Sequence, residues 1–219
     1  MSCPIDWAAT GSMLGGVGAV GGAIAIVWAA LVGKGALEDW RGEKLAGREV
    51  EAAEQALKAA YRAKDAIDGM RMRVIWAGEL EGSEKALKDA GVNLDLLEEK
   101  EKSSQVRRGV VYRRADLFKD DFNAIFDAIP SAKIFFGDAV EENLRLFLKA
   151  RQRILGSADM LPMMTEPFSE EDRKVVTDIN RDLLGKWSDD QEDKVGEMVD
   201  DAVEKLEALL LPKLRLPTK

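Results

Sequence analysis

Apolar and polar positions are distributed very unevenly along this chain. Residues 7–33 (WAATGSMLGGVGAVGGAIAIVWAALVG) contain no charged side chain, although charged residues make up 33% of the whole sequence. A bilayer core about 30 Å thick is crossed by roughly 20 apolar residues in a helix. Backbone polar groups in hydrocarbon must satisfy one another, which predicts a helix here in spite of the glycines. We therefore expect a transmembrane helix over 11–33.

The flanks of this stretch predict its orientation. Trp7 and Trp28 lie toward its two ends, where indole rings favour the headgroup layer, and Lys34 and Arg41 follow it. These four residues are the predicted interface anchors. Basic residues mark the cytoplasmic side, so we expect residues 1–10 to form an extracytoplasmic stub and the rest of the chain to be cytoplasmic. A cleaved signal peptide is the alternative, but no basic residue precedes the apolar run.

Small residues on the predicted span form a candidate face for helix packing. They recur at intervals of three or four, and such faces let helix backbones approach closely in lipid. Self-association of the span is therefore predicted. The alternative is that small residues are merely common in membrane helices, and here they occur on nearly every face. The residues of the predicted face are Gly11, Gly15, Gly18, Gly22, Ala25 and Ala29.

Helical periodicity continues beyond the span. Apolar residues at alternating intervals of three and four, such as Val50, Ala53 and Leu57, predict a long amphipathic juxtamembrane helix over 34–80. Lys64 and Arg71 interrupt this seam, which argues against a long dimeric coiled coil. The following residues, 81–109, contain glycines and a run of charges and predict a linker or insertion with short helical turns.

The pattern over 110–212 predicts a helical bundle, followed by a tail over 213–219. An apolar stripe that includes Phe122, Ile125 and Ile129 runs up to Pro130, where we expect that helix to end. Further on, Ser169 and Asp172 have the spacing of a helix-start capping box. No segment alternates long enough to predict a strand. The expected fold class is all-α, with one N-terminal transmembrane helix and an antiparallel helical bundle.

Composition narrows the chemistry. The net charge is −8, and an acidic body is a poor match for phosphate backbones, so nucleic acid is not an expected partner. Histidine is absent, which removes imidazole-based catalysis and the usual zinc sites. The single cysteine, Cys3, excludes an internal disulfide, and both acylation and an idle thiol stay open for it. Adjacent acidic residues fall mostly in first turns of predicted helices, where they complement the dipole.

Two further motifs resemble sites with chemical roles. Gly16, Gly18 and Gly21 match a dinucleotide fingerprint, but that fingerprint works only between a strand and a helix, and no strand is predicted before it. A basic cluster, for which we expect ion pairs with nearby acids in preference to an anion site, is formed by Arg107, Arg108, Arg113 and Arg114. The sequence thus predicts no catalytic, cofactor-binding or metal-binding residue, and no enzyme.

The run RADLFKDDFNAIFDAIPSAKIFFGDAVEENLRLFLKARQRI, beginning at Arg114, resembles a group of uncharacterised bacterial single-span proteins. In that group an alanine- and phenylalanine-rich helix leads into a turn like Phe135–Phe136–Gly137 and then another helix. The resemblance implies a bacterial inner membrane. It implies no activity and no catalytic residues.

The sequence therefore predicts a membrane-anchored helical interaction or scaffold protein. Its expected partners are the bilayer through residues 11–33, another copy of itself, and a protein that the sequence does not identify. One alternative is an oligomeric membrane-perturbing or pore-forming protein, although the span has no polar stripe to line water. The other is an enzyme that uses carboxylates alone, for which no site geometry is recognisable.

Overall fold

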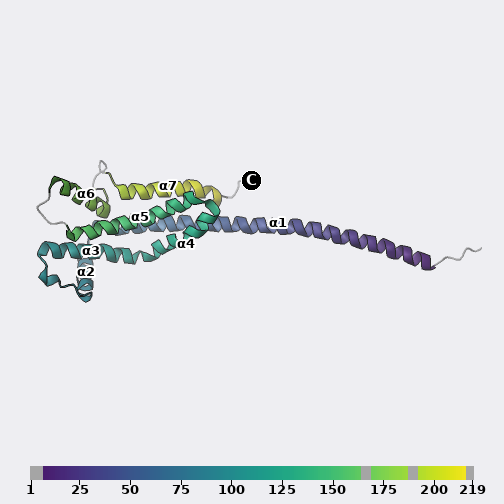
Figure 1. The fold of residues 1–219 in the computed structure, drawn as a ribbon, viewed down its shortest axis with the longest axis horizontal. Coiled ribbons are helices and arrows are strands. Elements are labelled where there is room, and N and C mark those ends of the chain that lie inside the picture. Colours follow the sequence, from purple (N-terminus) through teal and green to yellow (C-terminus); the bar gives the residue numbers. More distant parts are fainter. Residues whose placement is uncertain (1–6, 164–168, 187–191, 216–219) are drawn as a thin grey trace, which may run out of the picture. The chain divides into compact units, whose positions relative to one another are not determined.

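The computed structural model describes residues 7–163, 169–186 and 192–215, and these residues contain helices and no strand. The prediction of an all-α fold is therefore confirmed. The elements in Figure 1 are α1 (Trp7–Met70), α2 (Ala77–Asp89), η1 (Leu94–Leu96), α3 (Glu99–Leu117), α4 (Lys119–Phe136), α5 (Asp138–Met160), η2 (Leu161–Met163), α6 (Glu170–Leu184) and α7 (Lys194–Leu214). The chain divides into two compact units, Met1–Arg48 and Glu49–Lys219.

The first unit consists, in its described part, of the beginning of α1. Every side chain described from Ile26 to Arg48 is exposed, and the large apolar Ile26 and Leu31 are 72% and 66% exposed. Among the described residues, no helix has an apolar stretch long enough to cross a membrane. The predicted span 11–33 falls mostly on residues whose side chains lie outside the described ones.

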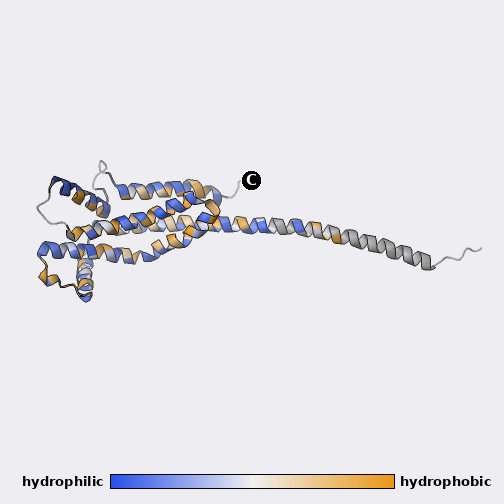
Figure 2. Cartoon of the chain, in the orientation of Figure 1, coloured by the Kyte–Doolittle hydropathy of each residue, from blue (hydrophilic) through white to orange (hydrophobic). Residues whose placement is uncertain are grey.

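The second unit is a helical bundle built around an alanine-rich face of α1. Four alanines of this face are completely buried, and so are large side chains that the neighbouring helices bring to the same core. Small residues opposite large ones let helices pack closely without voids. Figure 2 shows polar and apolar positions side by side along these helices, as one-sided burial requires. The alanines are Ala53, Ala56, Ala60 and Ala63, and the large partners include Ile125, Leu144, Phe147 and Leu206.

Contacts between helices give the bundle an antiparallel arrangement. Glu49 of α1 pairs with Lys213 of α7 at 2.8 Å, while Lys64, further along α1, pairs with Asp200, which comes earlier in α7. The partner number falls as the α1 number rises, so the two helices run in opposite directions. Helices α4 and α5 form a hairpin at Gly137, whose φ of 79° lies in the left-handed region that favours glycine.

The prediction that Pro130 ends its helix is wrong. Helix α4 continues through Pro130 to Phe136, because Ile129 and Ala132 on both sides of the proline are buried in the core. Pro130 is on the exposed side, and so is Phe126, whose carbonyl loses its usual partner four residues later. The predicted capping box is confirmed: the Ser169 hydroxyl accepts from the backbone N–H of Asp172, whose carboxylate accepts from the backbone N–H of Ser169.

Two helix boundaries differ from those expected. Helix α1 ends at Met70, about ten residues earlier than the pattern suggested, and residues 71–76 form a connection to α2. Residues 81–109, expected as a linker or insertion, contain most of α2 and the start of α3, which pack against each other. The buried Ser83 hydroxyl donates to the carbonyl of Val106 at 2.7 Å and joins the two helices. The short side chains and glycines that resembled a linker therefore allow close helix contact.

Candidate functional site

The residues predicted for membrane contact all lie on α1 within the first unit. Trp28, Ala29, Lys34 and Arg41 are exposed along the helix, and Trp28 is 68% exposed. The side chains of the other predicted residues lie outside the described ones: Trp7, Gly11, Gly15, Gly18, Gly22 and Ala25. Both the anchors and the packing face stay predictions.

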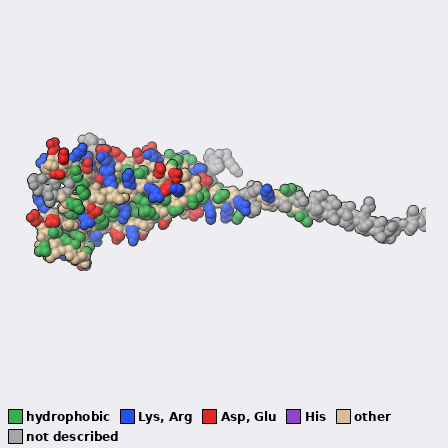
Figure 3. Space-filling model, viewed as in Figure 1, with side chains coloured by type: hydrophobic (Ala, Val, Ile, Leu, Met, Phe, Trp, Pro, Cys, Tyr) green, Lys and Arg blue, Asp and Glu red, His purple; other side chains and the backbone are tan. Residues whose placement is uncertain are grey.

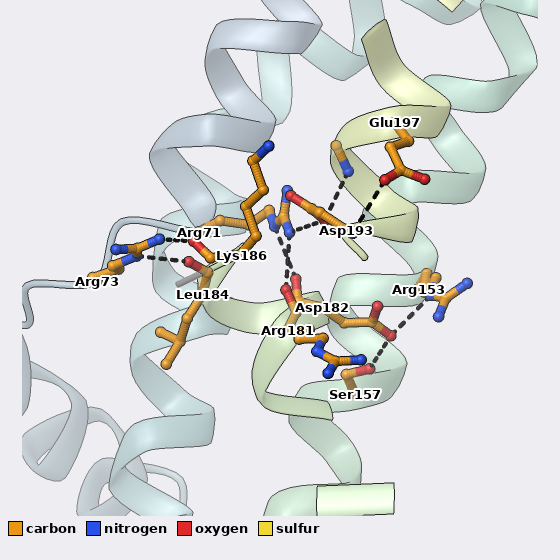
Figure 4. Close-up of polar contacts among 11 residues, drawn as sticks. Arg71, Arg73, Arg153, Ser157, Arg181, Asp182, Leu184, Lys186, Asp193 and Glu197 are labelled. Carbon is orange, nitrogen blue, oxygen red and sulfur yellow. Dashed lines mark hydrogen bonds and ion pairs between the residues drawn. The ribbon is translucent and has the colours of Figure 1, made fainter. Parts of the chain in front are cut away.

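A network of arginines, which we call the arginine junction, lies where α1 ends beside α6 and α7 (Figure 4). Its centre is Arg71, which is only 7% exposed. The Arg71 guanidinium donates to the carbonyls of Arg181 and Asp182 at 2.9 and 3.0 Å. These carbonyls lie in the last turn of α6, where a helix lacks its own donors and carries partial negative charge. Arg71 therefore caps α6 from outside.

The same guanidinium also connects α1 to the start of α7. It donates to the Asp193 carboxylate at 2.5 Å, and Asp193 in turn accepts from the backbone N–H of Gly196 at 3.0 Å as the N-cap of α7. Burial acts to raise the pKa of Asp193, but Arg71 and the Gly196 N–H outweigh it, and the pKa is lowered. One buried cation thus fixes the end of α6 and the beginning of α7.

Asp182 extends the junction to α5. Its carboxylate accepts from Arg153 at 2.8 Å and from the buried Ser157 hydroxyl at 2.9 Å, and Figure 4 shows both side chains directed at it. Arg73, two residues after Arg71, donates to the carbonyls of Leu184 and Lys186 just beyond the Arg71 contacts. In the junction, the carbonyls at the end of α6 and the carboxylates of Asp182 and Asp193 therefore all accept hydrogen bonds from arginines.

A second buried arginine holds the connection between α1 and α2. Arg114 of α3 is 6% exposed, and it donates to the carbonyls of Met72 and Val74 at 2.5 and 2.7 Å. It also forms a two-pronged pair with Glu79 at 2.7 and 2.8 Å. The hydrogen bonds from Arg114 lower the pKa of Glu79. These contacts hold residues 71–76 in their non-helical conformation.

Two of the four arginines in the basic cluster predicted on α3 are thus paired with acids. Arg108 binds Asp159 at 2.8 Å and stacks on the Tyr112 ring at 5.3 Å, and Arg114 binds Glu79. The expected pairing with acids is confirmed for these two arginines. Sequence periodicity placed Arg71 as an interruption of an apolar seam, and that interruption was the only signal for the arginine junction.

These arrangements serve structure more directly than catalysis. The buried carboxylates of the junction are already occupied by arginines and backbone donors, which leaves little room for acid–base work. Within the described residues, no group of His, Cys, Asp and Glu side chains has the geometry of a metal site. Comparisons with protein-family models, with curated proteins and with solved structures gave no match.

Proposed function

We propose that this chain is a membrane-anchored interaction or scaffold protein. Residues 11–33 form the transmembrane helix, which associates with a second copy. The bundle of residues 49–215 lies in the cytoplasm and presents helix faces to a protein partner.

One observation supports the proposal that residues 11–33 anchor the chain in a membrane. The 27 residues from Trp7 to Gly33 carry no charge and belong to the continuous helix α1. Their described large side chains, Ile26, Trp28 and Leu31, are at least 66% exposed. Apolar surface left in water costs about 25 cal/mol per Å². A helix that is apolar on all sides is buried either in a membrane or in the core of a large protein, and every side chain described in this part of α1 is exposed, so we assign it to lipid.

An outward ridge on α4 supports the interaction role. Phe126, Pro130 and Ile134 follow at i, i+4 and i+8 on the exposed side, and Phe126 and Ile134 are 55% and 78% exposed. We call these three residues the α4 ridge. Figure 3 shows that acidic, basic and hydrophobic side chains are interspersed over the bundle on the face in view. An apolar row of this kind has the spacing by which helices dock into grooves of other proteins.

Membrane partition tests the anchor. Val20→Asp places a charge near the middle of the span and is expected to cost about 2.5–3.5 kcal/mol of insertion, moving protein from the carbonate-washed membrane pellet to the supernatant. Val50→Asp is the matched control, because Val50 is exposed on the same helix beyond the span. Recovery of the full-length unaltered chain in the supernatant would refute the anchor.

Cys3 provides a test of orientation, because it is the only cysteine in the chain. A membrane-impermeant maleimide should label Cys3 on intact spheroplasts. In a Cys3→Ser background, Lys174→Cys on the exposed side of α6 should react only after permeabilisation. The reverse pattern would overturn the cytoplasmic placement of the bundle.

Crosslinking in native membranes, followed by affinity purification, tests the scaffold role. We expect one partner to be recovered at stoichiometric yield with the unaltered chain and to be lost with the double variant Phe126→Asp and Ile134→Asp. Val175→Asp is the control, since Val175 is an exposed apolar residue on α6, away from the α4 ridge. Recovery of self-crosslinks alone would reject a protein partner and leave self-assembly.

A further inference from the structure

A cavity of about 130 Å³ lies beside the arginine junction, between the end of α1, helix α3 and helix α6. Its accessible apolar wall includes Met72, which is 48% exposed, and the half-buried Ile75, Leu161 and Leu184. The buried Met70, Val110 and Leu183 also line it, but each is at most 6% exposed. Arg107 and Asn180 also line it and are exposed, so the cavity reaches the surface of the bundle. It therefore combines an apolar interior with a polar rim.

The charge on the cavity wall has one sign. Among the described residues, three arginines line it and no carboxylate does, although the chain as a whole carries a net charge of −8. Arg73 and Arg114 are engaged with backbone carbonyls, and Arg114 also with Glu79. For Arg107, none of the hydrogen bonds or ion pairs of the described residues supplies an acidic partner, unlike its neighbour Arg108. The guanidinium of Arg107 is thus available to an anion.

The dimensions indicate how much of a ligand fits inside. Apolar cavities of about 150 Å³ in proteins bind benzene, so this one has room for an apolar group of about six carbons. A single available guanidinium binds a carboxylate through two parallel hydrogen bonds and matches its single charge, whereas it neutralises only half of the charge of a dianionic phosphate. The amide of Asn180 adds a donor on the opposite element.

We propose that this cavity binds a short-chain carboxylate, an anionic amphiphile with about six carbons. The carboxylate lies on Arg107 and Asn180, and the chain lies on Ile75, Leu161 and Leu184. Every lining residue belongs to the second unit, so this inference holds whether or not the first unit enters a membrane.

Methyl NMR of the full chain tests the proposal. The protein is labelled with ¹³C-methyl methionine in phosphatidylcholine nanodiscs, or in buffer if it proves not to be membrane-bound, and titrated with hexanoate. Signals of Met70 and Met72, which line the cavity, should shift and saturate below about 10 mM, while Met198 on α7 stays in place. Hexanol, hexylamine and acetate each lack one required feature and should bind at least tenfold more weakly.

Two matched variants locate the head group. Arg107→Gln should weaken hexanoate binding at least tenfold while the Met198 signal shows that the bundle is intact. Arg113→Gln should leave binding unchanged, because Arg113 lies on the same helix but faces Gly82 of α2 and does not line the cavity. Absence of shifts at Met70 and Met72, equal binding of hexanol, tighter binding of hexyl phosphate, or equal effects of the two variants would overturn the proposal.

Discussion

Helix α1 passes through two different environments without a break in its backbone. Up to Arg48 every described side chain is exposed, including Trp28 and Leu31, whereas from Ala52 onward one face of the same helix is buried by other helices. The same continuous helix therefore forms both where its side chains are exposed and where other helices bury them. Hydrogen bonds within the backbone sustain it in both places, and the side chains decide what surrounds it.

The side chains of the two parts differ in a way that explains this. The buried part uses alanine toward the core, as at Ala56 and Ala63, and charged residues such as Arg62 toward water, where Arg62 pairs with Asp121 of α4 at 2.6 Å. The first part has large apolar residues with no charged face between Trp7 and Gly33. One-sided patterning predicts a protein neighbour, and unbroken apolarity predicts lipid.

The largest loss of stability is expected from removing a large side chain from the bundle core. Phe147→Ala removes a side chain that is 0% exposed and should lower the free energy of unfolding by about 3–5 kcal/mol, measured by urea titration of the full chain. Phe126→Ala, at an exposed position of the α4 ridge, should cost less than 1 kcal/mol. Equal losses would mean that Phe147 does not lie in the core.

The arginine junction should be nearly as sensitive. Arg71→Met leaves Asp193 and two carbonyls of α6 without their donor, and we expect a loss of about 3 kcal/mol, the lower end for a broken buried pair because the Asp193 side chain is still 13% exposed. Hydrogen exchange should show the C-terminal end of α6 and the N-terminal beginning of α7 opening first. A uniform loss of protection across the bundle would contradict the local role of Arg71.

Replacing an alanine with leucine in each part of α1 compares how tightly the two parts are packed. Ala63→Leu inserts three carbons where the exposed fraction is 0% and should cost about 2 kcal/mol. Ala29→Leu makes the same change at an exposed position of the first part and should leave the unfolding of the bundle unaltered. A loss at Ala29 of the same size would show that the first part also packs against protein.

Acid should weaken the bundle through its paired carboxylates. The pKa values of Asp193 and Glu79 are lowered in the folded chain, so the unfolded chain binds protons more readily, and stability is lost as pH falls below about 4. Asp68 acts with the opposite sign, because burial raises its pKa and its protonation relieves that cost. Unfolding measured from pH 6 to 2 should show a shallower loss for Asp193→Asn and a steeper one for Asp68→Asn.

The sequence predicts helices well where apolar residues recur on one face. It predicts poorly where a contact between distant residues determines where a helix ends or what a side chain binds. The stripe through Phe122 and Ile125 and the Ser169 capping box were visible because they depend on neighbours in the chain. The continuation of α4 past Pro130 is not visible in the sequence, because it depends on the burial of Ile129 and Ala132, which outweighs one lost hydrogen bond. The arginine junction joins Arg71 to residues more than a hundred positions away, and periodicity contains no information about such a partner.

The smallest effect is expected from replacing single glycines of α1 with alanine. The direction of this effect should differ between the two parts of the helix. An added methyl group at Gly47 meets no heavy atom within 4 Å, so Gly47→Ala should stabilise the surrounding helix by about 0.5–1 kcal/mol and slow exchange of the flanking amides about two- to fivefold. At Gly69 the same group would lie 2.4 Å from Cζ of Phe118, so the ring, which lies between α3 and α4, must move. Gly69→Ala should therefore speed exchange at the α3–α4 boundary in spite of its better helix propensity. If both variants slowed exchange alike, Phe118 would not be packed on α1, and the contrast between an open and an enclosed part of this helix would have to be redrawn.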